Sequence, residues 1–161
     1  MTNRGFEEHD HTACVTGALA NAEVYCQTHR LKLTPTRRRV LEILLREHKA
    51  MGAYDLLPIL AGEGLGTQPP VAYRALDFLV SNGFAHKVEK LNAYVACSFS
   101  GQTHVPAFMI CRECAAVVEA TTAPDAGPLG RAAKTAGFTI ETAVVEAEGL
   151  CPLCQDKGAR S

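Results

Sequence analysis

Hydrophobic residues in the first half of the chain recur every three or four positions, a spacing typical of helices with one buried face. The clearest case begins at Pro35, because Thr34 is a suitable N-cap and proline suits the first helical position. The predicted buried face of this helix consists of Val40, Leu41, Leu44 and Leu45.

Two more apolar segments flank this helix and predict helices of their own. One covers residues 17–29 and precedes it, and the other covers residues 53–66 and follows it. Pro58 lies inside the second segment, so we expect a short helix that is interrupted there, because proline cannot donate an intrahelical hydrogen bond. The glycines at positions 62, 64 and 66 are expected to end this helix.

A fourth helix is predicted near the middle of the chain. It begins at Pro69 or Pro70, because proline is favoured in the first turn, and it stops at Asn82 and Gly83. Its predicted buried face consists of Ala72, Leu76, Leu79 and Val80.

Residues 85–97 alternate between apolar and polar positions and predict a β-hairpin that turns near residues 91–92. A symmetric turn at that point would place His86 directly opposite Cys97. Helices followed by such a hairpin describe a winged helix-turn-helix, an arrangement that binds DNA.

The sequence after this hairpin changes character and predicts a second domain, so the expected fold class is α+β. A helix is predicted over residues 129–136 and a strand over residues 139–149. The predicted organisation is a flexible tail (1–16), a winged-helix domain (17–97), a polar connector (98–104) and a C-terminal domain (105–161).

Basic residues are concentrated in one part of a chain whose net charge is −1. Residues 28–49 hold seven Lys and Arg against two Glu, and they include the run Arg37, Arg38 and Arg39. Such a run favours contact with DNA phosphates, although an ordinary solvated helix face explains it equally well.

The fourth helix is the predicted recognition helix, because Tyr73 and Arg74 lie in its first turn. Arginine suits a guanine base, which offers it two acceptors in the major groove. The alternative is a surface ion pair between Arg74 and Asp77 at helical spacing, which would have no role in binding.

Other classes of protein are disfavoured by the sequence. It contains no apolar run long enough to cross a bilayer, and its acidic start is unlike a signal peptide, so we expect a cytoplasmic protein without a membrane partner. The motifs of metalloproteases and deaminases are missing, which argues against an enzyme and a small-molecule substrate.

The chain contains seven cysteines, which in a reducing compartment favour metal ligands or buried thiols over disulfides. Two C-x-x-C motifs, CREC at residues 111–114 and CPLC at residues 151–154, supply the four thiolates of a tetrahedral structural zinc site. The predicted ligands are Cys111, Cys114, Cys151 and Cys154. A redox-active pair is the alternative, but the βαβ pattern of a thioredoxin is missing.

Three cysteines lie outside these motifs: Cys14, Cys26 and Cys97. Cys97 and His86 could share a metal across the predicted hairpin, although a histidine beside a buried cysteine is the simpler explanation. The segment HDHTAC, residues 9–14, contains two histidines and could also bind metal, but a mobile tail is the favoured interpretation.

Six motifs are spread over residues 33–154: LTPTRRRVLEIL, AYDLL, VAYRALDFLVSNGFAHKVE, NAYVAC, THVPAFMICRECAAVVE and GLCPLC. Their succession resembles the ferric uptake regulator family, and within it the zinc uptake regulator branch, over about residues 17–154. Members of this family are homodimeric repressors with an N-terminal winged helix and a C-terminal dimerisation domain. They bind palindromic operator DNA when they are loaded with metal.

The resemblance implies one structural and one regulatory Zn²⁺ in each chain, the structural ion on the four cysteines of the two motifs. The implied ligands of the regulatory ion are His86, Cys97, His104 and Glu119. The implied DNA contacts are Tyr54, Tyr73 and Arg74. The family's T-V-Y-R is V-A-Y-R here, with Val71 in place of the threonine, so a hydroxyl available for a phosphate is missing.

Cys97 distinguishes between metals, because a soft thiolate beside imidazole and carboxylate suits zinc, whereas iron and manganese prefer nitrogen and oxygen ligands. The expected function is therefore zinc-responsive repression of zinc-uptake genes, and the alternative is an iron- or peroxide-responsive regulator of the same family. The implied ligands lie in the hairpin, the connector and the second domain. Zinc is thus expected to hold the two domains in one orientation.

Overall fold

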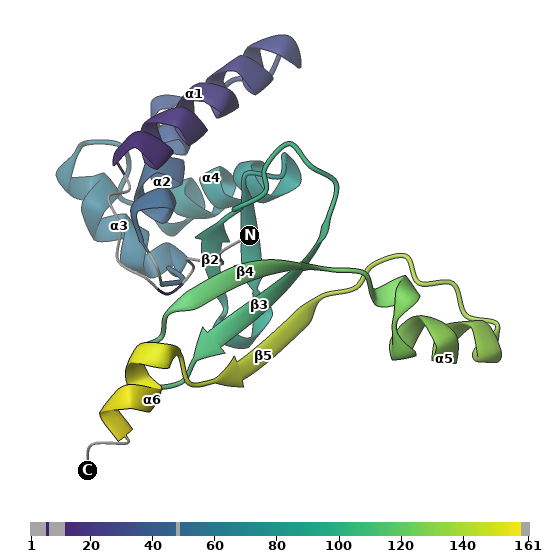
Figure 1. The fold of residues 1–161 in the computed structure, drawn as a ribbon. Helices are drawn as coiled ribbons and strands as arrows, with labels where there is room; N and C mark the ends of the chain where they lie inside the picture. Colours follow the sequence, from purple (N-terminus) through teal and green to yellow (C-terminus); the bar gives the residue numbers. More distant parts are fainter. Residues whose placement is uncertain (1–5, 7–11, 48, 159–161) are drawn as a thin grey trace.

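The structure, a computed structural model, describes residues 6, 12–47 and 49–158. Four helices come first along the chain: α1 (Thr12–Thr28), α2 (Pro35–Arg46), α3 (Ala53–Gly62) and α4 (Pro69–Ser81) (Figure 1). Two antiparallel strands follow them, β1 (Ala85–Val88) and β2 (Ala93–Ala96). This order of elements confirms the predicted winged helix-turn-helix, and the two strands and their loop are its wing.

The predicted start of α2 is confirmed. The side-chain oxygen of Thr34 accepts a hydrogen bond from the N–H of Arg37 at 3.3 Å, and Pro35 is the first helical residue. The buried residues of α2 are Val40, Leu41, Ile43 and Leu44. The predicted Leu45 is only half-buried, and Ile43 takes its place in the core.

α1 begins at Thr12, earlier than the predicted start at position 17. Val15 is buried, so the apolar stripe of the helix extends one turn further toward the N-terminus than the sequence pattern indicated. α1 has 17 residues and is the longest helix of the described chain. None of the described helices combines the length and the hydrophobicity needed to cross a bilayer.

α3 continues through Pro58, so the predicted interruption is wrong. Proline removes only one hydrogen bond here, the one that would go to the carbonyl of Tyr54 in the first turn. Leu56 and Leu60 are fully buried on either side of the proline, and their packing favours the unbroken helix. The predicted end is confirmed, because α3 stops at Gly62.

α4 ends as predicted, with Asn82 as its C-cap and Gly83 in the left-handed conformation at φ 75°. One residue of its predicted buried face is wrong, because Val80 is 37 % exposed. Ala75 is buried instead, so the buried stripe consists of Ala72, Ala75, Leu76 and Leu79.

The register of the wing differs from the predicted one. His86 pairs with Val95, so it does not lie directly opposite Cys97. The loop of residues 89–92 contains one 3₁₀ turn, which Asn92 closes in the left-handed conformation at φ 47°. Its centre lies one residue earlier than predicted, and each residue of β1 therefore faces a partner two positions closer to the loop.

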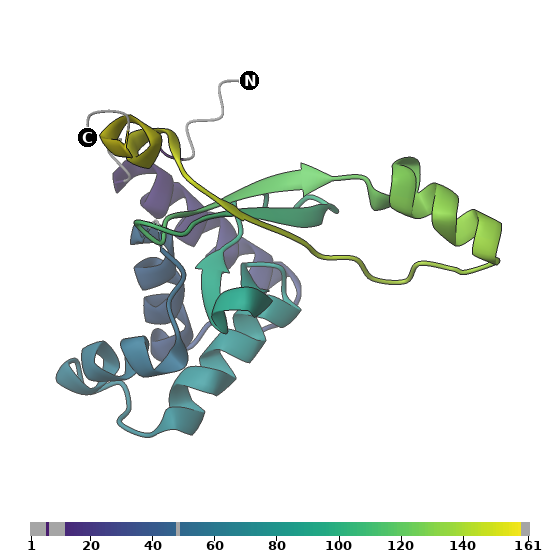
Figure 2. The same ribbon diagram turned by 90° about the horizontal axis from the view of Figure 1, so that it is seen from below.

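A second sheet contains the strands β3 (Val105–Cys111), β4 (Val117–Thr122) and β5 (Val145–Gly149). β3 is the central strand, antiparallel to β4 and parallel to β5. The connection between β4 and β5 contains the 3₁₀ helix η2 (Pro124–Ala126) and α5 (Pro128–Ala136), and α6 (Pro152–Gly158) follows β5. α5 projects away from the sheet in both views (Figures 1 and 2).

β5 is shorter than the strand predicted over residues 139–149. The N–H of Arg112, just after β3, bonds to the carbonyl of Gly149 at 2.9 Å. Because N–H groups alternate sides along a strand, the even-numbered residues of β3 also direct their N–H groups toward β5. Pro106 occupies one of these positions and has no N–H, so regular pairing starts only at Val145.

Two apolar clusters form the interior. The larger one lies among the four N-terminal helices, and its fully buried residues include Val40, Leu56, Leu60, Leu76 and Leu79. The smaller one joins the wing to the second sheet and consists of Val88, Phe108, Ile110 and Val117. The wing is therefore packed against the C-terminal sheet and is not free in solvent (Figure 2).

Candidate metal centres and nucleic-acid surface

The four residues implied as regulatory ligands lie together where the two sheets meet, and we refer to them as the His–Cys–Glu centre. They are His86 on β1, Cys97 just after β2, His104 just before β3 and Glu119 on β4. One ligand atom of each lies within 4.8 Å of the ligand atoms of the others.

Glu119 is at the middle of this centre. Its Oε1 lies 2.8 Å from Nε2 of His104 and 3.0 Å from Nε2 of His86. The Sγ of Cys97 lies 3.9 Å from the same oxygen and 3.6 Å from Nε2 of His104. The donor atoms thus converge from four different segments of the chain.

Backbone groups orient these side chains. The Oε2 of Glu119 accepts the N–H of Ser98 at 2.7 Å, and the Sγ of Cys97 accepts the N–H of Phe99 at 3.4 Å. The Nδ1 of His104 lies 2.8 Å from the carbonyl oxygen of Gln102 and can only donate to it. In the neutral ring this bond leaves the lone pair of Nε2 directed into the centre, as in histidines that bind metals, whereas the protonated ring donates its Nε2–H to Glu119.

Burial and charge shift the pKa values of the centre. Burial, together with the charge of Glu119, raises the pKa of the Cys97 thiol to about 12. Burial alone would raise the pKa of Glu119, but the His86 ring, the N–H of Ser98 and the His104 ring stabilise its charge and lower it. The centre therefore holds a buried carboxylate beside a thiol that stays protonated at neutral pH.

The donor set fits a metal ion. His86 Nε2 is buried and has no well-directed hydrogen bond to any described residue; its 3.0 Å approach to Glu119 Oε1 is favourable only when the ring is protonated. With a neutral ring, this buried nitrogen and a carboxylate that is only 7 % exposed are both costly without a cation between them. Two imidazoles, one thiolate and one carboxylate are ligands that zinc accepts in tetrahedral sites.

The predicted pairing of His86 with Cys97 is corrected in detail. The two residues are diagonal neighbours across the wing, not direct partners, because the register is shifted. Diagonal positions remain within reach of one another, so both side chains still enter the same centre.

The four cysteines of the two C-x-x-C motifs form a second cluster, the four-cysteine centre. Cys111 ends β3, Cys114 lies in the following turn, Cys151 precedes α6 and Cys154 lies on α6. Their Sγ atoms all lie within 4.8 Å of one another. This convergence of four thiols is the geometry of a tetrahedral zinc site.

Backbone N–H groups prepare the four-cysteine centre for a cation. The N–H groups of Cys114 and Cys151 lower the pKa of Cys111 to about 6, so this sulfur is a thiolate at neutral pH.

The turn after Cys111 needs Ala115 at φ 60°, a left-handed conformation that costs a non-glycine residue about 1–2 kcal/mol.

The other candidate ligands of the N-terminal region do not form a centre in the described chain. Cys14 is exposed on α1, and Cys26 is buried in the helical core. His9 and His11, in the segment predicted as a flexible tail, lie outside the described residues.

The residues expected to contact DNA lie on the helical domain. Tyr54 on α3 is 69 % exposed, Tyr73 on α4 is 39 % exposed, and Arg74 on α4 is exposed as well. Among the described residues, Arg74 has no ion-pair partner, so the alternative pairing with Asp77 is not found. The guanidinium of Arg74 is therefore available to a partner.

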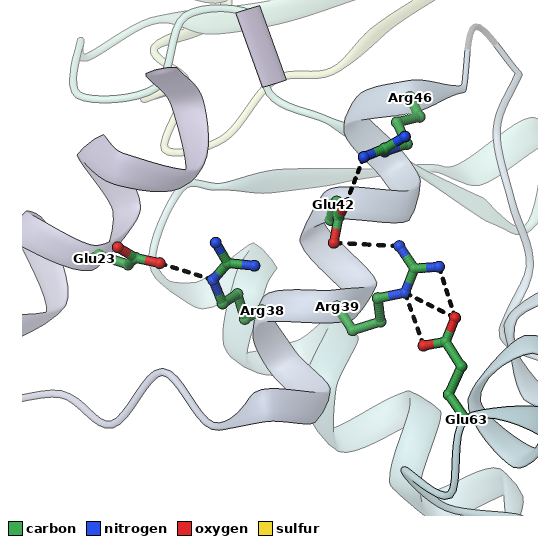
Figure 3. Close-up of polar contacts among 6 residues, drawn as sticks. All are labelled: Glu23, Arg38, Arg39, Glu42, Arg46 and Glu63. Atoms are coloured by element: carbon green, nitrogen blue, oxygen red, sulfur yellow. Dashed lines mark hydrogen bonds and ion pairs between the residues drawn. The ribbon is translucent and has the colours of Figure 1, made fainter. Parts of the chain in front are cut away.

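The arginine run of α2 makes contacts within the chain (Figure 3). Arg38 forms an exposed ion pair of 2.7 Å with Glu23 on α1. Arg39 binds Glu63 through two nitrogens and is thereby held against the end of α3. The guanidinium of Arg37 lies 3.9 Å from the centre of the Phe78 ring, a cation–π contact.

Sequence reasoning missed the groups that surround the His–Cys–Glu centre. Ser98 and Phe99 bind its ligands through backbone N–H groups, which no sequence signal distinguishes. It also missed Glu146 on β5, whose carboxylate binds two N–H groups of the wing loop. The alternation of Glu146 and Glu148 with small residues in the predicted strand was the signal available for the second case.

The fold and the two centres define a class of protein: a winged helix-turn-helix of the DNA-binding type, joined to a second sheet by a cluster of residues that could hold a metal ion. The chain belongs to the Ferric uptake regulator family, whose sequence model matches residues 28–148. The resemblance seen in the six motifs is thereby confirmed.

Proteins similar to this chain include a curated relative and two solved structures. The Zinc uptake regulation protein of Escherichia coli (strain K12) is 42 % identical over 137 residues, or 84 % of this chain and 80 % of the relative. A zinc uptake regulator complexed with zinc and DNA is 40 % identical, with a TM-score of 0.83 over 90 % of this chain and 97 % of that chain. The structure of holo XcZur is 37 % identical, with a TM-score of 0.74 over 86 % of this chain and 96 % of that chain.

Proposed function

We propose that this protein is a zinc-responsive transcriptional repressor, a homodimer that binds palindromic operator DNA when zinc is loaded and represses zinc-uptake genes. The observation that carries the proposal is that the four ligands of the His–Cys–Glu centre belong to different parts of the chain. They come from the wing, the connector and the second sheet, so a single ion would contact both domains. The names of the similar zinc uptake regulators support the same function.

The donor set favours zinc as the sensed metal. Cys97 contributes a soft sulfur ligand beside two imidazoles and one carboxylate, whereas iron and manganese sensors favour nitrogen and oxygen ligands. The four-cysteine centre has the set of thiols typical of a structural zinc that contributes directly to folding. We assign one regulatory and one structural Zn²⁺ to these two centres.

The proposed mechanism couples the His–Cys–Glu centre to the orientation of α4. When it is bound, zinc supplies the positive charge that holds the mutually repelling ligands together. The wing, which carries His86, is then fixed to β4, which carries Glu119, and the helical domain follows the wing. A shift of orientations from about 1:99 to 99:1 needs about 5.5 kcal/mol of differential binding, within the range of a four-ligand site.

The proposed DNA contacts follow from exposure. Arg74 and Tyr73 lie on the predicted recognition helix, where arginine can bind both acceptors of a guanine. Tyr54 on α3 and Arg38 on α2 are also exposed and suit phosphate contacts. Arg38 must exchange Glu23 for a phosphate, a small cost because exposed ion pairs contribute only about 0–1 kcal/mol. Arg37 is placed similarly, although its contact with Phe78 limits its reach.

A second copy of this chain is the proposed partner of the C-terminal domain. Large apolar side chains are exposed on α5 and on the approach to β5: Leu129, Phe138, Val144 and Val145. Exposed apolar side chains of this kind, one on α5 and three between its end and the start of β5, in a part of the chain that stands away from the rest, are typical of an interface (Figure 1). A symmetric pair would present two recognition helices to the two halves of a palindrome.

The test is a DNA-binding titration against buffered free zinc, with iron and manganese in parallel. The probe is a palindromic duplex selected from a random-sequence library at saturating zinc. We expect operator affinity to rise by about 5- to 150-fold as zinc fills the His–Cys–Glu centre, which is the second zinc site of the chain. This rise should occur at lower free concentrations of zinc than of iron or manganese. An operator affinity that is independent of zinc would overturn the proposal.

A further inference from the structure

One row of residues crosses the face of the C-terminal sheet that contacts the wing. Phe108 of β3 is paired with Glu119 of β4 on one side and with Glu146 of β5 on the other. Paired residues of neighbouring strands point to the same face, so the two carboxylates flank the buried phenyl ring. Glu119 belongs to the His–Cys–Glu centre, whereas Glu146 has no role in either metal centre.

Glu146 binds the loop of the wing. Its Oε1 accepts the N–H of Glu89 at 2.6 Å, and its Oε2 accepts the N–H of Lys90 at 2.9 Å. Hydrogen bonds that end on a charged carboxylate are roughly twice as strong as neutral ones. A single side chain thus satisfies two consecutive backbone donors of a loop that lies 56 residues or more away in sequence.

Two further contacts surround this pair of bonds. Lys90 Nζ lies 3.4 Å from Glu148, two residues further along the same face of β5. Val88, which ends β1, is fully buried against Phe108 and Ile110. The wing is therefore attached to the sheet at one end through His86 and Glu119, and at its loop through Glu146, with the apolar cluster between the two.

We propose that Glu146 is a positioning residue for zinc sensing, a latch that holds the wing on the C-terminal sheet independently of the metal. The apolar cluster is not directional, whereas the two hydrogen bonds of Glu146 fix where the loop lies along β5. The latch raises the fraction of molecules in which His86 and Cys97 lie close to His104 and Glu119 before zinc arrives. It rests on the proposed function, because it assigns a role in loading the regulatory site.

The latch affects the apparent zinc affinity by changing the fraction of molecules in which the four ligands are already arranged to bind zinc. The observed dissociation constant equals the intrinsic constant divided by the fraction of molecules in the binding-competent arrangement. Removing one of the two hydrogen bonds, and the carboxylate charge that strengthens the other, lowers that fraction, so zinc should bind the His–Cys–Glu centre about tenfold more weakly without any change of ligand. The four-cysteine centre does not involve the wing and should be unaffected.

The test compares Glu146→Gln with wild type and with the control Glu141→Gln. The glutamine keeps the size of the side chain but replaces one acceptor with a donor, whereas Glu141 is exposed and makes no hydrogen bond or ion pair with the described residues. Zinc affinity at the second site is measured by competition with a chelator, on protein that retains the zinc of its four-cysteine centre. Glu148→Gln serves as a graded variant and should weaken zinc less than twofold, because its ion pair is exposed.

A Glu146→Gln protein with weaker second-site zinc, an unchanged zinc content of the four-cysteine centre and an unchanged control would support the latch. Equal zinc affinity in Glu146→Gln and wild type would overturn it. Failure of wild type itself to bind a second zinc would instead refute the proposed function. A second measurement does not depend on zinc binding: with only the structural zinc present, protease should cleave the connector of Glu146→Gln faster than that of wild type, and equal rates would also overturn the latch.

Discussion

At the scale of single residues, the two oxygens of Glu119 have different tasks. Oε2 is already bound by the N–H of Ser98, while Oε1 faces His86, Cys97 and His104. Oε1 is therefore the oxygen placed to serve as a ligand, which completes a set of four donor atoms with two nitrogens and one sulfur. The backbone of the connector thus sets how a side chain of β4 can bind.

Cys97→Ser tests the regulatory assignment. Serine is a poor zinc ligand at neutral pH, so the His–Cys–Glu centre should lose its zinc while the four-cysteine centre keeps one per chain. Operator affinity at saturating zinc should fall by about 5- to 150-fold, to the level of zinc-depleted protein. Zinc content and fluorescence anisotropy with labelled operator measure the two effects.

The matched control for this variant is Cys14→Ser, because Cys14 is exposed on α1 and lies far from both centres in the sequence. It should behave as wild type in both measurements. A Cys97→Ser protein that still represses in response to zinc would contradict the assignment of Cys97.

At the scale of elements, α5 depends on a glycine for its position. Gly130 is buried, and a methyl group at this position would overlap the backbone carbonyl of Asp125 in η2. Neither element can move easily, because the contact is between two backbones. The close approach of α5 to η2 therefore needs the absence of a side chain.

Gly130→Ala should destabilise the protein by about 1–3 kcal/mol through this overlap. Gly17→Ala is its control, because Gly17 lies in the interior of α1 with nothing within 4 Å of the added methyl group. That substitution should stabilise the protein by about 0.5–1 kcal/mol, since alanine suits a helix interior better than glycine. Urea unfolding at saturating zinc compares the two, and a Gly130→Ala protein as stable as wild type would be inconsistent with the packing.

The four-cysteine centre joins three elements, since its thiols belong to the end of β3, the turn before β4 and the start of α6. Cys111→Ser should therefore cost folding or dimerisation, in contrast to Cys97→Ser, because a structural zinc contributes its binding free energy to folding. Circular dichroism and size-exclusion chromatography measure the outcome. A stable dimer without zinc at the four cysteines would show that this centre is not structural.

At the scale of the whole molecule, the wing connects the helical domain to the second sheet. It carries His86 at one end, and its loop binds Glu146 at the other, so the orientation of the helical domain depends on both contacts. Under the proposed function, zinc binding and DNA binding select among the same orientations. Any such linkage between two sites must act equally in both directions.

Operator DNA should therefore tighten zinc binding at the His–Cys–Glu centre by the factor by which zinc tightens operator binding, about 5- to 150-fold. Competition with a chelator, with and without operator, measures the first factor, and the DNA titration measures the second. Equal zinc affinity in the presence and absence of operator would rule out coupling through domain orientation.

Local signals predicted much of the fold. The N-cap at Thr34, the end of α3 at Gly62 and the stop of α4 at Asn82 and Gly83 depend on neighbouring residues and are confirmed. The continuation of α3 through Pro58 was predicted wrongly. It depends on leucines that are buried against other helices, and propensity alone does not contain that information.

Register was the less predictable quantity. The wing was predicted to turn at residues 91–92, but the 3₁₀ turn moves its centre by one residue and shifts every pair by two. The start of β5 is fixed by Pro106 on a neighbouring strand, which no pattern within residues 139–149 could indicate. Both outcomes depend on partners distant in sequence or on loop geometry.

The sequence by itself determined the helices, the wing, the two C-x-x-C motifs and the family, because these depend on the order and spacing of residues along the chain. Only the tertiary structure decided which side chains meet. His104 and Glu119 join His86 and Cys97, and Glu146 meets the wing loop, because strands from distant segments pair in a particular register. The reason is physical: a metal ligand or an acceptor acts over about 2–3 Å, and spacing in sequence does not set such distances.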